Sequence, residues 1–303
     1  MDNRKIIYIA GYSRSGSTIL DILLGSQTNI FGTGELFYLF EDWLTGTRTC
    51  TCGAVYKDCS FWKDLELPQD ISLQQAKAIV ENVENRKYIS ALTSGKIAPD
   101  IIEKYALIQT ALYDYIFKTS GKSIVVDSSK TSRDMAGRFY ALHTYANFDV
   151  YVIHLVKNGL SVVESYVKKG RNWALEGYGK NDRFAAARSS VGWLLGNAIA
   201  QNLGTKMPEN RYLQIKYEDL ITQPENVLQK IGAFVDTDLS EVITMIKNEV
   251  PFQPEHNVGG NRLRLEKEIR FSKKYDSKKT NLSVYHRLIF NVIAGRLHKK
   301  LGY

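Results

Sequence analysis

Residues 11–18, GYSRSGST, have the glycine spacing of a phosphate-binding loop, but they lack the lysine that usually completes it. In such loops glycines let the backbone close around an anion, and N–H groups at the start of the next helix point at it. In nucleoside triphosphate-binding loops the lysine contacts the β- and γ-phosphates and the next hydroxyl binds magnesium. Ser17 stands at the lysine position, and Arg14 supplies a cation from within the loop. This pattern favours an anion site without magnesium triphosphate, and an ordinary glycine turn is the alternative.

Further charged and aromatic side chains follow apolar runs elsewhere in the chain. Lys157 ends the run VYVIHLV and precedes Ser165 by eight positions, Lys130 follows SIVVDSS, and Tyr217 opens YEDL behind LQIK. Glu35 lies in GTGEL, shortly after the first loop. Open α/β sheets bind ligands where their strands end, so Lys130, behind SIVVDSS, is a candidate for a ligand site. The alternatives are a solvated lysine at 157, a salt bridge at Lys130, a half-buried aromatic at Tyr217 and a helix-start glutamate at Glu35.

The elements that must position these residues alternate between strand and helix patterns. KIIYIAGY, SIVVD, DVYVIHLVK and RYLQIKY are short apolar runs typical of buried strands. The spacing predicts helices after the first loop up to Gly25, over 72–94, and over 99–118 with Pro99 at its start and Gly121 at its end. We therefore expect an α/β fold of the P-loop-like, three-layer type, with a central, mostly parallel sheet flanked by helices.

Two later segments also predict helices. In VGWLLGNAIA the apolar residues fall on one helical face, namely Val191, Leu194, Leu195, Ala198 and Ile199. Thr222 and Glu225 bracket Pro224 as a capping box ahead of NVLQKIGAF. Because no repeat or Pro/Gly-rich linker interrupts the chain, we expect a single domain over 1–303 with a helical insertion at about 36–120.

Four segments, in this order, resemble those of sulfotransferases that use 3′-phosphoadenosine 5′-phosphosulfate (PAPS): GYSRSGSTILDILLGSQTNIFGTGEL, VYVIHLVKNGLSVVESY, LQIKYEDLITQPENVLQKIGAF and GGNRLR. The cysteine segment CTCGAVYKDCSFW is similar to one in bacterial-type members. The resemblance implies that PAPS is the co-substrate and that its 5′-phosphosulfate binds Ser13, Arg14, Ser15, Gly16, Ser17 and Thr18. It further implies that Lys157 and Ser165 bind the 3′-phosphate, that Tyr217 contacts the adenine, and that Arg262 and Arg264 belong to a loop closing over the nucleotide.

Lys157 departs from the family pattern, which has arginine at that position. Lysine offers a point charge where arginine would form two parallel hydrogen bonds, so we expect Arg262 and Arg264 to compensate. Many cytosolic family members use a histidine two residues after a lysine as the catalytic base, but Ser132 stands there after Lys130. Protein-tyrosine and several glycan sulfotransferases carry a glutamate after the loop, so Glu35 is the predicted base. Arg14 and Lys130 are then expected to balance charge on the sulfuryl group and the leaving oxygen.

Composition bounds these interpretations. The 303 residues carry 40 Lys and Arg against 32 Asp and Glu, a net charge of +8 that favours an anionic ligand. A P-loop-like nucleotide kinase and a non-enzymatic basic nucleotide-binding module are the alternative functions. A kinase would need the missing lysine and a magnesium carboxylate, and no recognised nucleic-acid motif supports a nucleic acid as partner. The predicted partner is a hydroxyl-bearing acceptor: a carbohydrate, a glycolipid or a small-molecule alcohol.

The acceptor pocket is expected between helices of 36–120 and the segment KKGRNWALEGYGKNDR, where Trp173 and Tyr178 are candidates for stacking on a ring. No apolar run reaches the ~20 residues of a membrane span or forms a signal-peptide core, so we expect a cytoplasmic protein without a transmembrane segment. Cys50, Cys52 and Cys59 lie close together, but a zinc site needs a fourth ligand. The sequence therefore favours a structural loop with reduced cysteines and no metal.

Overall fold

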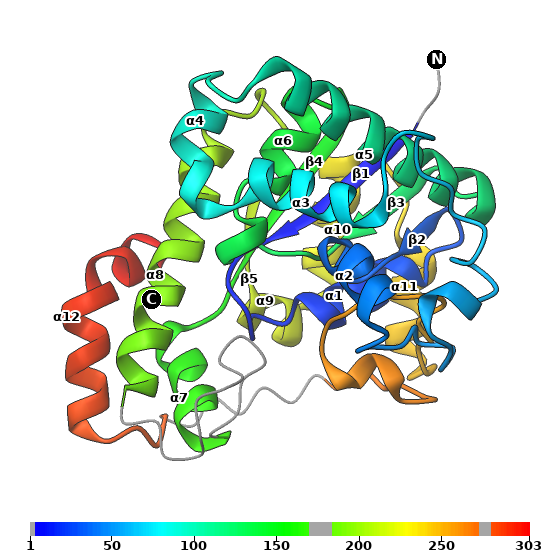
Figure 1. Ribbon diagram of the computed structural model, residues 1–303. Helices are drawn as coiled ribbons and strands as arrows, with labels where there is room; N and C mark the ends of the chain where they lie inside the picture. The colour runs from blue at the N-terminus through cyan, green and yellow to red at the C-terminus, as the bar shows by residue number, and fades with distance from the viewer. Residues whose placement is uncertain (1–3, 170–183, 273–279) are drawn as a thin grey trace.

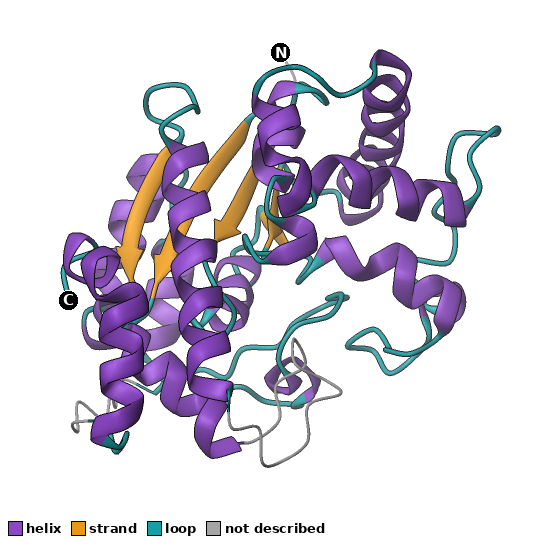
Figure 2. Ribbon diagram, turned by 60° about the vertical axis from the view of Figure 1, so that its left-hand side comes forward, coloured by secondary structure: helices purple, strands orange, loops and turns teal. Residues whose placement is uncertain are grey.

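The protein is built around a five-stranded parallel sheet. The computed structural model describes residues 4–169, 184–272 and 280–303. The strands are β1 (Lys5–Ala10), β2 (Ile30–Gly32), β3 (Ile124–Asp127), β4 (Val150–Val156) and β5 (Tyr212–Lys216), in the spatial order β2-β3-β1-β4-β5. Figure 2 shows the strands as arrows that all point in the same direction. All neighbouring pairs run parallel, which confirms the predicted sheet.

β1 is the central strand and is buried along its whole length. It pairs with β3 on one side, where Ile7 lies opposite Val126, and with β4 on the other, where Tyr8 lies opposite Val152. Wholly apolar strands of this kind belong in a parallel sheet that is covered on both faces. The chain leaves β1 toward β2 and β3 and later adds β4 and β5 on the opposite side, so the strand order reverses beside β1. Ligands of open α/β sheets bind at such a reversal, outside the carboxyl ends of the strands.

Helices cover both faces of the sheet (Figure 1). Ile7 and Ile9 point to the face covered by α1 (Ser17–Gly25), α10 (Pro224–Val235) and α11 (Ser240–Lys247). Ile6 and Tyr8 point to the face covered by α3 (Leu73–Glu84), α5 (Pro99–Ser120), α6 (Arg138–Thr144) and α8 (Ala185–Gly204). The sheet and its two helical layers make the predicted three-layer α/β fold.

The remaining elements extend these layers. α7 (Gly159–Lys169) and α12 (Val284–Lys300) pack with α8 around Trp193 and Phe290. Shorter elements are α2 (Leu39–Thr45), α4 (Ile89–Thr93), α9 (Tyr217–Thr222), η1 (Leu36–Tyr38), η2 (Tyr56–Asp58), η3 (Arg86–Tyr88), η4 (Arg133–Met135) and η6 (Arg262–Leu265). No helix in the described ranges is both long and apolar enough to cross a membrane.

The predicted helix over 72–94 is wrong, because Asn85 interrupts it. Asn85 is extended (φ −63°, ψ 141°), caps the end of α3 and accepts a hydrogen bond from the N–H of Lys87, so the chain restarts as η3 and α4. The next helix is confirmed: Pro99 opens α5, and Gly121 follows its end in the left-handed conformation.

Two other local predictions also need correction. The buried face of α8 contains Trp193, Gly196, Asn197 and Ala200, whereas Val191 is exposed. Small residues turn inward because a Cβ at Gly192 would lie 2.4 Å from the hydroxyl of Tyr12, so only glycine permits this approach. The capping box at Thr222 does not form, since Gln223 is the N-cap of α10 and the Thr222 hydroxyl donates to the carbonyl of Glu218 in α9.

A buried ion network fixes the end of β3. Arg138 donates from Nε to Asp127 at 2.7 Å and from Nη1 to Glu84 at 2.6 Å, and all three side chains are almost fully buried. Burial raises the pKa of Glu84 to about 7, and the guanidinium of Arg138 opposes that rise. Asp127 also accepts from the N–H of Ser129 at 2.9 Å. The network thereby joins α3 and α6 to the segment that carries Lys130.

His154 in β4 makes stability depend on pH. It is fully buried between Tyr212 and Asn197, and burial lowers its pKa from 6.5 to about 4. Between these pH values the unfolded chain binds a proton that the folded chain does not, so the free energy of unfolding falls as pH falls through this window. We predict a shallower pH slope for His154→Gln in urea unfolding from pH about 7 to about 4.5. His286→Gln, at a half-exposed position, is the control, and equal slopes in wild type and His154→Gln would contradict the prediction.

Candidate active site

The loop between β1 and α1 is shaped to receive an anion. Gly11 (φ 128°) lies so close to β4 that a Cβ there would meet the carbonyl oxygen of Leu155 at 2.5 Å. Arg14 (φ 71°) and Gly16 (φ 93°) are left-handed, and Gly16 is the N-cap of α1. That helix has no side-chain cap and no acidic residue in its first turn. The Ser15 hydroxyl is buried and has no hydrogen-bond partner among the described residues. The loop therefore holds unsatisfied donors at a helix N-terminus, which is where anions bind.

The predicted 3′-phosphate residues meet this loop. Nε of Arg14 donates to Oγ of Ser165 at 3.2 Å, so α7 reaches the loop after β1. Nζ of Lys157 lies 4.0 Å from the ring centroid of Tyr217. A Cβ at Gly16 would fall 2.3 Å from the same ring. The ends of β1, β4 and β5 thus bring Arg14, Gly16, Lys157, Ser165 and Tyr217 into one group.

Glu35 and Lys130 form an ion pair beside that group. Nζ of Lys130 donates to Oε1 of Glu35, and the side chains are 9% and 11% exposed. Lys130 is left-handed (φ 73°), and its carbonyl accepts from the hydroxyl of Tyr8. Glu35 is the N-cap residue of η1, a helix-start position as in the alternative considered for it, but its side chain makes no capping hydrogen bond and pairs with Lys130 instead. The ion pair itself is the alternative considered for Lys130, and it places a carboxylate and an ammonium together near the α1 N-terminus.

Hydrogen bonds of Thr131 connect the segment that carries Lys130 to the loop between β1 and α1. Its N–H donates to the carbonyl of Gly11 at 2.9 Å, and its hydroxyl donates to the carbonyl of Gly196 in α8 at 2.8 Å. The N–H of Gly11 donates to the same hydroxyl at 3.1 Å. These bonds hold the turns after β1 and β3 in a fixed relation.

The glycine–arginine segment lies over Glu35 and the start of α1. A Cβ at Gly260 would lie 3.4 Å from Oγ1 of Thr18 and 3.6 Å from Oε1 of Glu35. Gly260 therefore packs against both side chains. The N–H of Asn261 donates to Oγ1 of Thr18 at 3.3 Å. Arg262 is exposed, whereas Arg264 is buried and donates to the carbonyls of Asn257 and Thr49. The nucleotide-binding role of both arginines stays a prediction, and Arg264 in this arrangement supports the segment itself.

Asp21 was not predicted as part of the site, although it supports Glu35 from below. It is completely buried, and it accepts from the N–H of Gly34 at 3.1 Å and from Nδ2 of Asn257 at 2.7 Å. Burial raises its pKa to about 7 against the hydrogen bonds that favour the charged form. The signal in the sequence is a lone carboxylate within the otherwise apolar helix TILDILLG. Its partner Asn257, 236 positions away, has no such signal.

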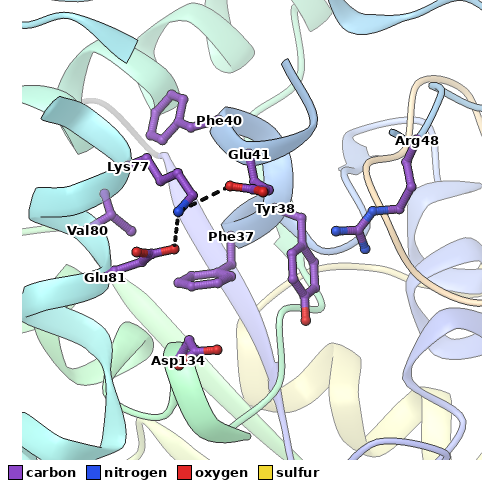
Figure 3. Close-up of a pocket in the computed structure, with 9 residues that line it drawn as sticks. All are labelled: Phe37, Tyr38, Phe40, Glu41, Arg48, Lys77, Val80, Glu81 and Asp134. Atoms are coloured by element: carbon purple, nitrogen blue, oxygen red, sulfur yellow. Dashed lines mark ion pairs between the residues drawn. The ribbon is translucent and has the colours of Figure 1, made fainter. Parts of the chain in front are cut away.

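A pocket of about 310 Å³ opens one turn from Glu35 (Figure 3). It is lined by Phe37, Tyr38, Phe40, Glu41, Arg48, Lys77, Val80, Glu81 and Asp134. Tyr38 donates its N–H to the carbonyl of Glu35 at 3.1 Å, and the guanidinium of Arg48 lies 4.1 Å from the Tyr38 ring centroid. Figure 3 shows Lys77 paired with both Glu41 and Glu81 across the pocket. The lining combines aromatic faces with charged groups. All lining residues except Asp134 belong to the segment 36–120, which the sequence predicted as a helical insertion.

Trp173 and Tyr178 lie outside the described residues, so their predicted stacking role stays a prediction. Ser13, Ser17 and Thr18 lie in the loop and the first turn of α1, and Ser17 is buried, while their binding of the 5′-phosphosulfate stays a prediction.

Comparison with known proteins agrees with this architecture. The model of a family described as the sulfotransferase family matches residues 7–241. The chain belongs to the sulfotransferase family. The sequence matched none of the curated proteins with which it was compared.

Two solved structures show the same fold. The sulfotransferase domain of the Synechococcus PCC 7002 olefin synthase is 19% identical with a TM-score of 0.56, covering 99% of this chain and 94% of that domain. The sulfotransferase domain of the curacin biosynthetic pathway is 20% identical with a TM-score of 0.55, covering 97% of each chain. At this low sequence identity the structural similarity shows a shared fold alone, and the function of this sulfotransferase must be argued from its site.

Gly34 should be intolerant of any side chain, because it joins Glu35 to the glycine–arginine segment. It is left-handed (φ 75°), and a Cβ would lie 2.2 Å from the carbonyl oxygen of Val258. Gly95 is also left-handed (φ 67°), but nothing lies within 4 Å of its Cβ position. Both Gly→Ala changes cost ~1–2 kcal/mol of backbone strain. We predict a clearly larger loss of unfolding free energy for Gly34→Ala than for Gly95→Ala in urea titrations, and equal losses would contradict the proposed contact.

Proposed function

We propose that this sulfotransferase moves a sulfuryl group from PAPS to a hydroxyl of an acceptor by in-line displacement. The observation that carries the proposal is the Glu35–Lys130 pair beside the uncapped N-terminus of α1. A carboxylate can take the acceptor proton while the ammonium and the loop donors offset negative charge. All these groups lie on loops that follow neighbouring parallel strands.

The described residues suit PAPS as donor. The unpartnered hydroxyl of Ser15 and the N–H groups at the start of α1 would bind the 5′-phosphosulfate. A transferred sulfuryl group carries less charge than a γ-phosphoryl group, so a serine at position 17 is compatible with transfer. The 3′-phosphate is a compact dianion that charged donors bind most strongly. Lys157, Ser165 and Arg14 supply such donors, and the ring of Tyr217 lies beside them for the adenine.

The reaction follows from these positions. Glu35 removes the proton of the acceptor hydroxyl as its oxygen forms a bond to sulfur. The bond between sulfur and the bridging phosphate oxygen breaks, and that oxygen leaves with the nucleotide as 3′-phosphoadenosine 5′-phosphate. Lys130 and Arg14 stabilise the negative charge that develops on the leaving oxygen and the sulfuryl oxygens. Holding both reactants in line replaces a bimolecular encounter, which supplies much of the rate.

We place the acceptor in the pocket of Figure 3. The aromatic rings of Phe37 and Tyr38 offer surfaces to a sugar or other ring, and Arg48, Glu41 and Lys77 offer hydrogen bonds to hydroxyls. The pocket lies near Glu35 along the chain, because Tyr38 lines it and the N–H of Tyr38 donates to the carbonyl of Glu35. A hydroxyl-rich acceptor such as a carbohydrate or glycolipid suits this lining better than an apolar alcohol.

We expect Lys157 to bind the 3′-phosphate of the nucleotide. We predict that Lys157→Ala weakens binding of 3′-phosphoadenosine 5′-phosphate by ~1.5–3 kcal/mol, the scale of a charged hydrogen bond. Binding of adenosine 5′-monophosphate, which lacks the 3′-phosphate, should stay nearly unchanged in the same calorimetric titrations. The control is Lys206→Ala, which removes an exposed lysine from the segment before β5. This segment lies before the amino end of the strand, whereas Lys157 follows the carboxyl end of β4. A similar loss for both nucleotides would show that Lys157 does not contact the 3′-phosphate.

Glu35 should be required for turnover and not for nucleotide binding. Glu35→Gln keeps the size of the side chain but cannot accept the acceptor proton, so kcat should fall by ~10²–10⁴. The assay transfers radiolabelled sulfate from PAPS to pooled carbohydrates, glycolipids and alcohols, and rates are then compared at saturating acceptor. Glu103→Gln, on the exposed side of α5, is the matched control. A folded Glu35→Gln protein with near-normal kcat would remove Glu35 from the mechanism.

A further inference from the structure

Four potential metal ligands meet away from the Glu35–Lys130 pair. Cys50, Cys52 and Cys59 lie on the loop that follows α2, and His256 approaches them from the segment that precedes the glycine–arginine loop. Their ligand atoms all lie within 4.8 Å of one another. Cys50 and Cys59 are buried, His256 is half-buried and Cys52 is exposed. The fourth ligand that the cysteine segment lacks in the sequence is therefore supplied by a distant part of the chain.

Three of the six separations between the ligand atoms are close to the edges of a zinc tetrahedron. Zinc bonds of about 2.3 Å to sulfur and about 2.0–2.1 Å to nitrogen imply sulfur–sulfur edges of roughly 3.8 Å and sulfur–nitrogen edges of roughly 3.5 Å. Sγ of Cys52 and Sγ of Cys59 are 3.6 Å apart. Nδ1 of His256 lies 3.5 Å from Sγ of Cys50 and 3.3 Å from Sγ of Cys59.

Surrounding groups hold the four ligands in this arrangement. Nε1 of Trp62 donates to the carbonyl of His256 at 3.0 Å, and the ring of Phe61 stacks on the imidazole with centroids 5.3 Å apart. Backbone N–H groups contact the sulfurs: that of Ala54 reaches Cys52, and those of Phe61 and Trp62 reach Cys59. N–H donors of this kind stabilise metal-bound thiolates and orient them.

We propose that Cys50, Cys52, Cys59 and His256 bind one Zn²⁺ ion. Three thiols lose their protons to solvent on binding, and four protein ligands complete the tetrahedron without an open position. A closed site of this composition is structural. The sequence had favoured a cysteine loop without metal because it shows no fourth ligand near the cysteines.

The zinc site joins two segments that position Glu35. His256 lies two residues before Val258, whose carbonyl accepts from the N–H of Glu35 at 2.6 Å and whose N–H donates to Thr33 at 2.7 Å. On the cysteine side, the hydroxyl of Thr51 donates to the carbonyl of Glu255 and accepts from the N–H of Asn257. Zinc therefore fixes the segment that lies over Glu35. The inference is independent of the proposed reaction, because it rests on the ligand geometry alone.

Metal content tests the proposal directly. Protein purified without metal-affinity steps or chelators should contain about one zinc ion per chain, measured by inductively coupled plasma mass spectrometry. His256→Asn should lower that content strongly, whereas His256→Cys should retain it because a thiolate replaces the imidazole. His286→Asn is the control histidine. Absence of bound zinc, or equal zinc in wild type and His256→Asn, would overturn the proposal.

Three further measurements remain informative if a variant folds poorly. Protein refolded with Co²⁺ should show the visible absorption bands of a tetrahedral thiolate complex, and Zn²⁺ titration should abolish them. Thiol titration of the denatured, metal-free protein should find all three cysteines reduced, whereas a Cys52–Cys59 disulfide would overturn the proposal. Removing zinc from wild type should speed amide hydrogen exchange in residues 33–36 and 255–260, and unchanged exchange would overturn the inferred link to Glu35.

Discussion

The parallel pairing of β1 with both β3 and β4 is the constraint on which the site depends. Parallel strands have their carboxyl ends on the same side of the sheet, so their pairing alone brings the turns after β1, β3 and β4 together. Thr131 then ties the turn after β3 to Gly11 and to α8, which holds Lys130 beside the loop that follows β1. The two helical layers bury the strands. The grouping of these residues is therefore a consequence of strand order.

Polar groups buried beneath the site complete its positioning. Arg138 satisfies Asp127 and Glu84 at the end of β3, and Asp21 satisfies Gly34 and Asn257 below Glu35. Buried charges of this kind are costly unless they are paired and hydrogen-bonded, so each network holds its partners in one arrangement. Contacts from Val258 and Gly260 add a third support, which reaches Glu35 from above.

The sequence predicted the parts of the site that follow local rules. The glycine loop and the four longer strands are visible because glycine spacing and strand patterns are local signals, whereas Lys157 and Glu35 were proposed from the family resemblance and their roles stay predictions. β2, of three residues, was too short to stand out, and the interruption at Asn85 depended on one cap. Asn257 and His256 act through contacts about 200 positions away, which no local pattern encodes. The inward face of α8 was misassigned because close packing at Gly192 and Gly196, and not apolar character, decides it.

Calorimetric titration with two nucleotides tests the central claim, a phosphate loop adapted to PAPS, most directly. We expect saturable binding of 3′-phosphoadenosine 5′-phosphate and much weaker binding of magnesium ATP at the same protein concentration. The reason is that Ser17 replaces the lysine of a triphosphate loop, while Lys157 and Ser165 provide for a 3′-phosphate. Binding of magnesium ATP that equals or exceeds that of 3′-phosphoadenosine 5′-phosphate would contradict the account and favour a nucleotide kinase.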